Sequence, residues 1–149
     1  MKKILILILT VIGASAAFCG ERFDAATWKG IQTYDAQTLS PTLGSHLGQV
    51  VGVRCNFRGK DIHHMKSNWF EGSLWQPNPQ GRKGFTDVRI MVAKADVRAF
   101  KEITTDHRSS APLVLYGKVT QDADFNFPFV RLMGRDANPD SSGNFEMRW

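Results

Sequence analysis

The chain lacks most of the features that would identify an enzyme. No Gly-x-Ser-x-Gly, His-Glu-x-x-His or phosphate-loop pattern is present. The chain has only two cysteines, Cys19 and Cys55, and no internal repeat. A formal net charge of +5 over 149 residues is mild and does not by itself imply nucleic-acid binding. These absences favour a single-domain, non-enzymatic protein, and they lead us to expect no cofactor.

The long apolar run lies at the N-terminus. Lys2 and Lys3 precede an uncharged run from Ile4 to Gly20, which ends in small residues. This pattern is typical of a secretory signal peptide cleaved after Ala16, and it predicts a secreted or periplasmic protein. Cleavage would remove two lysines and no acid, so the net charge would fall from +5 to +3. The alternative is an uncleaved anchor, but a spanning helix needs about 20 predominantly apolar residues.

The predicted location determines which chemistry is open to the two cysteines. In an oxidising compartment Cys19 and Cys55 could form a disulfide, worth about 3–4 kcal/mol on the chain-entropy model. The alternative is that Cys55 is a small buried residue of a strand. Lipidation of Cys19 is disfavoured by Phe18, because lipoprotein signals usually have a small residue at that position.

The remainder of the chain predicts strands and one helix. Apolar residues alternate with other residues in most of the expected strands, and Gly and Pro separate the second from the third. Asp96 can cap a short helix in which Val97, Phe100 and Ile103 recur on one side. The predicted strands are 49–57, 68–75, 85–92, 113–120 and 129–134.

The order of three strands, a helix and two strands resembles the OB-fold, a five-stranded Greek-key barrel with a short helix between strands 3 and 4. The segments that carry the resemblance are Leu47–Arg54, Val88–Val92, Leu113–Val119 and Phe129–Gly134. The resemblance is one of pattern, and another barrel topology or a small sandwich remains an alternative. It divides the chain into a signal peptide (1–16), an N-terminal extension (17–46) and one OB-like β-barrel domain (47–149).

The resemblance also implies a binding surface. OB-folds bind oligonucleotides or oligosaccharides on strands 2 and 3 and on the loops after strands 1 and 4. Basic and aromatic residues at those positions are the ligand-binding candidates: Arg58, Lys60, Trp69, Trp75, Arg89, Phe125 and Phe127. The alternative is that at least two of Trp69, Phe70 and Trp75 fill the barrel core.

Two kinds of metal site are weaker alternatives. Asp61, His63 and His64 could hold zinc or copper and support a metal-binding protein or metal-dependent enzyme. Asp and Asn alternate in 122–126 and in 136–140 as in calcium loops, but both segments lack the glycine and glutamate of such loops. Asp and Asn are also ordinary turn residues.

The sequence therefore predicts a secreted or periplasmic binding or interaction module of a bacterial envelope. The expected partner is an envelope protein, a peptide or a glycan. An extracytoplasmic binder of single-stranded nucleic acid or oligosaccharide is a further alternative. Asp122 near the predicted surface and the extracytoplasmic location both disfavour nucleic acid.

Overall fold

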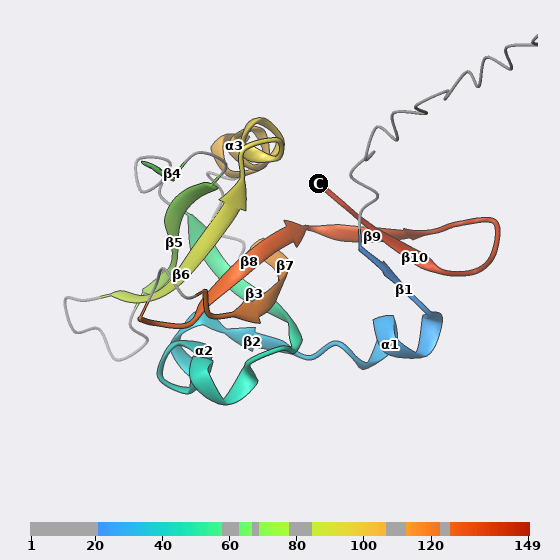
Figure 1. The fold of residues 1–149 in the computed structure, drawn as a ribbon, viewed down its shortest axis with the longest axis horizontal. Coiled ribbons are helices and arrows are strands. Elements are labelled where there is room, and N and C mark those ends of the chain that lie inside the picture. Colours follow the sequence, from blue (N-terminus) through green and yellow to red (C-terminus); the bar gives the residue numbers. More distant parts are fainter. Residues whose placement is uncertain (1–20, 58–62, 67–68, 78–84, 107–112, 123–125) are drawn as a thin grey trace, which may run out of the picture.

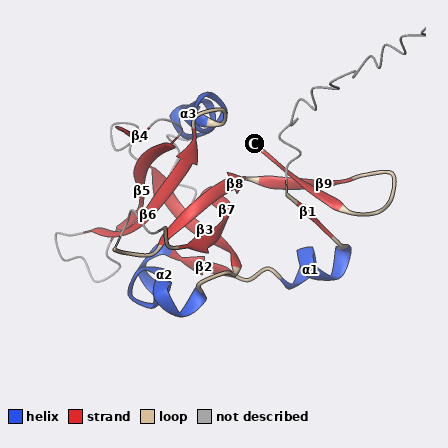
Figure 2. Ribbon diagram, in the orientation of Figure 1, coloured by secondary structure: helices blue, strands red, loops and turns tan. Residues whose placement is uncertain are grey.

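The chain is mainly β-structure in two sheets, with short helices (Figures 1 and 2). This computed structural model describes residues 21–57, 63–66, 69–77, 85–106, 113–122 and 126–149; of these, 56–57, 63–66, 69, 74–77, 85–86 and 105–106 are described by backbone only. None of the helices in these ranges is long and apolar enough to cross a membrane. The elements are β1 (Arg22–Phe23), α1 (Ala25–Gly30), β2 (Thr33–Asp35), α2 (Ala36–Thr42), a 3-10 helix η1 (Leu43–His46), β3 (Val50–Phe57), β4 (His63–Lys66), β5 (Trp69–Pro77), β6 (Phe85–Ala93), α3 (Val97–Asp106), β7 (Leu113–Thr120), β8 (Phe129–Gly134), β9 (Asp136–Pro139) and β10 (Phe145–Arg148).

The larger sheet has seven strands in the order β2-β3-β7-β8-β6-β5-β4. Strand β2 is parallel to β3 and β6 is parallel to β8, whereas the other neighbours are antiparallel. The end of β3 also pairs with β5, where Asn56 lies opposite Trp75 and Phe57 opposite Leu74. The sheet is therefore strongly curled, but it is not a closed barrel, because β2 and β4 form its two ends.

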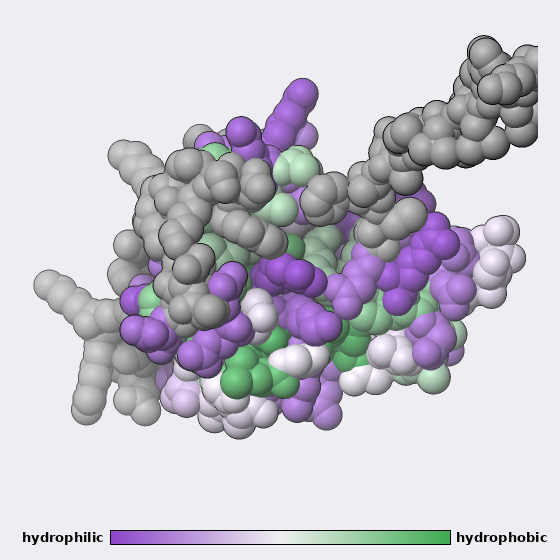
Figure 3. Space-filling view, viewed as in Figure 1, coloured by the Kyte–Doolittle hydropathy of each residue, from purple (hydrophilic) through white to green (hydrophobic). Residues whose placement is uncertain are grey.

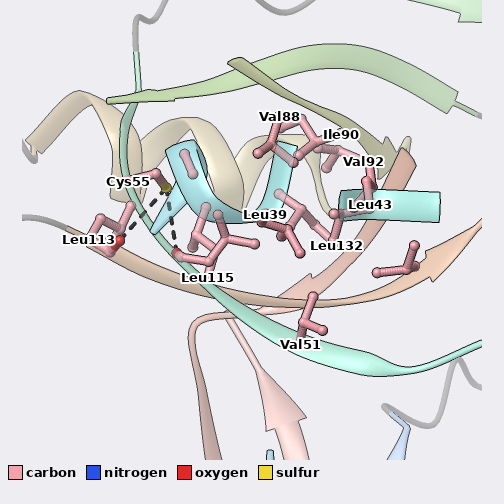
Figure 4. Packing of buried hydrophobic residues seen from close by; sticks show 14 of the residues in the cluster. Leu39, Leu43, Val51, Cys55, Val88, Ile90, Val92, Leu113, Leu115 and Leu132 are labelled. Atoms are coloured by element: carbon pink, nitrogen blue, oxygen red, sulfur yellow. Dashed lines mark hydrogen bonds between the residues drawn. The ribbon is translucent and has the colours of Figure 1, made fainter. Parts of the chain in front are cut away.

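The inner surface of this curled sheet forms the main hydrophobic core (Figure 4). Strand β7 alternates buried and half-buried residues along its whole length, as expected for a strand with one face in a core. Two helices complete the core: α2 contributes Leu39 and α3 contributes Phe100, both 0% exposed. The inward residues of the strands include Val51, Val53, Cys55, Val88, Ile90, Val92, Leu113, Leu115, Val119, Val130 and Leu132.

The smaller sheet has the order β1-β10-β9 and lies on the right in Figure 1 with α1, away from β4 and β5. Helix α1 begins after Asp24, whose side chain accepts a hydrogen bond from the Thr27 amide at 2.8 Å. This helix places Trp28 against Tyr116 of β7 and Phe145 of β10, with ring centroids 4.9 and 5.9 Å apart. The small sheet and α1 thus pack on the outer surface of the larger sheet.

A second hydrophobic cluster forms at this contact. Its buried residues are Phe23, Ala137 and Met147 from the small sheet. Outward-facing residues of β3, β7 and β8 pack against them, and we call these residues the covered face: Val50, Tyr116 and Met133.

A glycine joins the two sheets. Gly134 ends β8, and a Cβ atom at this position would collide with the backbone carbonyl oxygen of Arg148 in β10. The next residue, Arg135, donates its amide to that same oxygen at 2.8 Å. The close approach of β10 to the end of β8 therefore requires glycine.

The prediction of a five-stranded closed barrel is not confirmed, although the five predicted strands and the helix are present as β3, β5, β6, β7, β8 and α3. Strands β2 and β4 extend the larger sheet, and the small sheet was not predicted. These additions are short, of two to four residues, and such strands are too short to show an alternating pattern. Residues of the predicted N-terminal extension also enter the main core, namely Ala36, Leu39 and Leu43.

Candidate functional site

The outer surface of β5 and β6 carries polar side chains. Along β6, Val88, Ile90 and Val92 enter the core, so Asp87, Arg89 and Met91 point outward. Arg89 lies opposite Ser73 of β5, and Met91 lies opposite Glu71. Asp87 and Arg89 are exposed. In Figure 3 the visible surface over β8 is largely hydrophilic.

Arg89 contacts an aromatic ring on this surface. Its guanidinium carbon lies 3.8 Å from the ring centroid of Phe127, which stands just before β8. This is a close cation–π contact, and it holds the guanidinium over the ring. Within the described residues Arg89 forms no ion pair, so its N–H groups are not neutralised there by a carboxylate. We call Glu71, Ser73, Asp87, Arg89 and Phe127 the Arg89 face.

The structure therefore brings together two of the seven predicted ligand-binding residues, Arg89 and Phe127. Trp69 and Trp75 lie in β5 opposite Ala93 and Asp87, but only their backbone is described. Phe70 packs against the main core, as the alternative of core-filling aromatic residues expects for this position. The other three predicted residues lie outside the described part of the chain: Arg58, Lys60 and Phe125.

The predicted metal ligands stay untested. His63 and His64 are adjacent in β4, opposite Glu71 and Phe70 of β5, and are described by backbone only. Asp61 lies outside the described residues. Among the residues that the structure does describe, no group of three His, Cys, Asp or Glu side chains could hold a metal ion.

Two carboxylates of the segment 136–140 serve as turn acceptors. Asp136 Oδ1 accepts from the Ala137 amide at 2.8 Å. Asp140 Oδ1 accepts from the amides of Ser142 and Asn144 at 2.8 and 3.0 Å, which shapes the loop between β9 and β10. This arrangement supports the alternative that these are turn residues rather than calcium ligands.

Cys55 is a buried residue of β3. It is 1% exposed and a free thiol, and its Sγ donates weakly to the carbonyl oxygens of Val53 and Leu113 at 3.6 and 3.7 Å (Figure 4). Burial raises the pKa of the Cys55 thiol to about 12, so almost no thiolate exists at neutral pH. The predicted bridge to Cys19 stays untested, because Cys19 lies outside the described residues.

A cluster of charges that the sequence did not reveal lies on the next strands. Lys118 of β7 and Arg131 of β8 are directly opposite each other and point outward. Both approach Glu21, with Lys118 Nζ 3.9 Å from Oε1 and Arg131 Nη2 3.5 Å from Oε2. Alternation along β7 and β8 could have placed the two cations on one surface. The partner Glu21 is about a hundred residues away in sequence and could not have been found in this way.

Comparison with known proteins adds little. No family model matches the chain, and no curated protein matches it. A crystal structure of a candidate nucleic acid-binding lipoprotein from Klebsiella pneumoniae is similar over 72% of this chain and 92% of that chain, with a TM-score of 0.38 and 21% identity. This likeness is too slight to support an inference about function.

Proposed function

We propose that the chain is an extracytoplasmic, non-enzymatic binding module that holds an acidic glycan on the Arg89 face. The observation that carries this proposal is the contact between Arg89 and Phe127, at 3.8 Å on an exposed part of the sheet. A guanidinium held over a ring is restricted in its orientation, and a carboxylate can accept two of its N–H groups. The same surface offers Ser73, a neutral hydrogen-bonding group opposite Arg89.

The proposed location is supported by the sequence of the first twenty residues. Two lysines, an uncharged apolar run and Ala14-Ser15-Ala16 form the three parts expected of a cleaved signal peptide. A protein exported in this way meets cell-wall and surface polysaccharides far more often than nucleic acid.

We also propose that the larger sheet is an elaborated OB-like fold. Support comes from the circuit of pairings β3–β5, β5–β6, β6–β8, β8–β7 and β7–β3, in which only β6–β8 is parallel. In chain order α3 lies between β6 and β7, the third and fourth of these five strands, as the helix of an OB-fold lies between strands 3 and 4. In that arrangement β5, β6 and the segment before β8 are the binding elements.

The surroundings of Arg89 favour a glycan over a peptide or a nucleic acid. Strand β6 is paired on both sides, by β5 and β8, so a peptide cannot add to the sheet beside it. Asp87, exposed and two residues from Arg89 on the same side of β6, would repel a ligand with a charge on every unit, such as single-stranded DNA. A glycan with separate carboxylates and flat sugar faces fits both conditions.

The experiment uses a hyaluronan oligosaccharide, which carries a carboxylate on every second sugar unit, and a neutral maltooligosaccharide of the same length. We expect the purified protein to bind the first and not the second in isothermal titration calorimetry. Arg89→Ala should weaken binding roughly 10- to 100-fold, since a charged hydrogen bond is worth roughly 1.5–3 kcal/mol. Phe127→Ala should also weaken it, because the guanidinium loses the ring that orients it.

Arg98→Ala is the matched control. Arg98 is an arginine of α3 whose side chain is 91% exposed, so its removal changes the net charge equally without touching the Arg89 face. Equal binding by the wild type, Arg89→Ala and Arg98→Ala would disprove the proposed site. Preferential, strongly salt-dependent binding of a thymidine oligonucleotide would replace the glycan by nucleic acid.

A further inference from the structure

Two cations, Lys118 and Arg131, form an anion-binding site. The anion that occupies it is the carboxylate of Glu21, from the chain itself. Both carboxylate oxygens of Glu21 are engaged, one by Lys118 at 3.9 Å and the other by Arg131 at 3.5 Å. The three side chains are each 34–42% exposed, so this site is open to solvent. Two cations on facing strands that converge on one carboxylate show where another carboxylate could bind.

This site is continuous with the Arg89 face. Lys118 lies opposite Arg131, and Arg131 lies opposite Met91 on the neighbouring strand β6. Arg89 follows two residues away on the same side of β6. From the spacings of a sheet, the Cα atoms of Arg89 and Arg131 are roughly 8 Å apart. Lys118, Arg131 and Arg89 therefore form a row of cations across three adjacent strands.

The Glu21 side chain is held loosely. Its backbone oxygen accepts from the Met147 amide at 3.2 Å, and the following strand β1 has only two residues, Arg22 and Phe23. Phe23, buried in the small cluster, holds this strand in place whether or not the Glu21 carboxylate is engaged. Since exposed ion pairs contribute little to stability, the carboxylate can leave its two cations without the fold opening.

We propose that Lys118 and Arg131 are a second carboxylate subsite for the same acidic glycan, and that Glu21 occupies this subsite until the ligand displaces it. This inference rests on the proposed function, because it extends the Arg89 face. Glu21 then acts as an internal competitor. It should weaken binding of a glycan long enough to reach both subsites, and it should not affect a single uronic acid that reaches only Arg89.

The test compares Glu21→Gln with Glu102→Gln. Both variants remove one ion-paired carboxylate and change the net charge equally, but Glu102 lies on α3 and pairs with Arg98 at 2.9 Å. We expect Glu21→Gln to tighten binding of the hyaluronan oligosaccharide roughly two- to fivefold, as one or two exposed pairs predict. Binding of monomeric glucuronate should be the same in both variants. Thermal unfolding of each variant checks that the fold is intact.

The double variant identifies the cause. In an Arg131→Gln background the gain from Glu21→Gln should fall to the level of Glu102→Gln, since part of the contested subsite is gone. If Glu21→Gln tightens binding no more than Glu102→Gln, or tightens it equally with Arg131 removed, the competition is disproved. Loss of binding in Arg89→Ala would still support the proposed function in that case. If neither Arg89→Ala nor Glu21→Gln changes binding, both proposals fail.

Discussion

The outer surface of the larger sheet has two parts that differ in what lies on them. On β3, β7 and β8 the covered face presents Val50, Tyr116 and Met133, and the small sheet with α1 packs over them. On β5 and β6 the Arg89 face presents charged and hydroxyl groups, and Arg89 and Asp87 are exposed. The residue type at outward positions thus follows the presence of a cover, because apolar side chains are stable there only when another layer removes them from water.

Met91 marks the boundary between the two parts. It points outward from β6 yet is 1% exposed, and it belongs to neither hydrophobic cluster. The residues directly opposite it are Glu71 on β5 and Arg131 on β8. Long charged side chains can bury a neighbour along their aliphatic parts while their charges stay in water. The surface therefore changes from hydrophobic packing to charged groups within a single strand.

The largest effect is expected at the contact between the larger sheet and the small sheet with α1, which together we call the cover. Gly134→Ala places a Cβ atom against the backbone oxygen of Arg148, which cannot move aside as a side chain can. We expect a loss of about 3 kcal/mol in the free energy of unfolding, measured by urea denaturation. Gly30→Ala is the control, because nothing lies within 4 Å of a Cβ atom there. Equal stability of the two variants would mean that β10 does not pack against β8 as described.

The next prediction compares the two parts of the surface directly. Met147→Ala empties a site in the small cluster, where Met147 is 4% exposed, and should cost about 2 kcal/mol of stability without weakening ligand binding. Arg89→Ala should leave stability within about 0.5 kcal/mol and weaken binding. Urea denaturation and calorimetric titration of both variants measure the two effects. If Arg89→Ala lowers the free energy of unfolding more than Met147→Ala does, or if Met147→Ala abolishes binding, the covered face and the Arg89 face do not have separate roles.

The same division explains what the sequence could predict. Strands of the main core are long enough to show alternation, as in Leu113, Leu115 and Val119, so five strands and the helix α3 were predicted correctly. The cover is made of elements of two to six residues. Strand β9 contains a proline, and neither β9 nor β1 carries enough apolar residues to show a period.

Residues of the candidate site were predictable where their place in the strand pattern alone put them on the binding surface. Arg89 and Phe127 were proposed from the OB-like pattern, and they contact each other in the structure. The subsite of Lys118 and Arg131 depends on the register of two strands and on Glu21 from the start of the described chain. Such a combination follows from tertiary packing, which the spacing of residues along a sequence does not encode.

The smallest expected effect concerns the contact between the cover and α3. Trp149 follows β10, packs against the main core and meets Phe100 edge to face, with ring centroids 5.8 Å apart. It also hydrogen-bonds the side chain of Asp96. Burial raises the pKa of Asp96 above its ordinary value of 3.8, and the bond from Trp149 lowers it by less. The folded state therefore binds this proton more tightly than the unfolded chain does.

The pH dependence follows from that sign. A raised carboxyl pKa in the folded state means that stability falls as the pH rises from 3.8 through the pKa of folded Asp96. Asp96→Asn cannot titrate, so its melting temperature should fall less than that of the wild type over this interval. Asparagine also accepts a hydrogen bond from the indole and suits the residue that precedes a helix, so the contact with Trp149 should persist. A steeper fall in Asp96→Asn than in the wild type would show that the charged carboxylate stabilises the contact between the cover and α3.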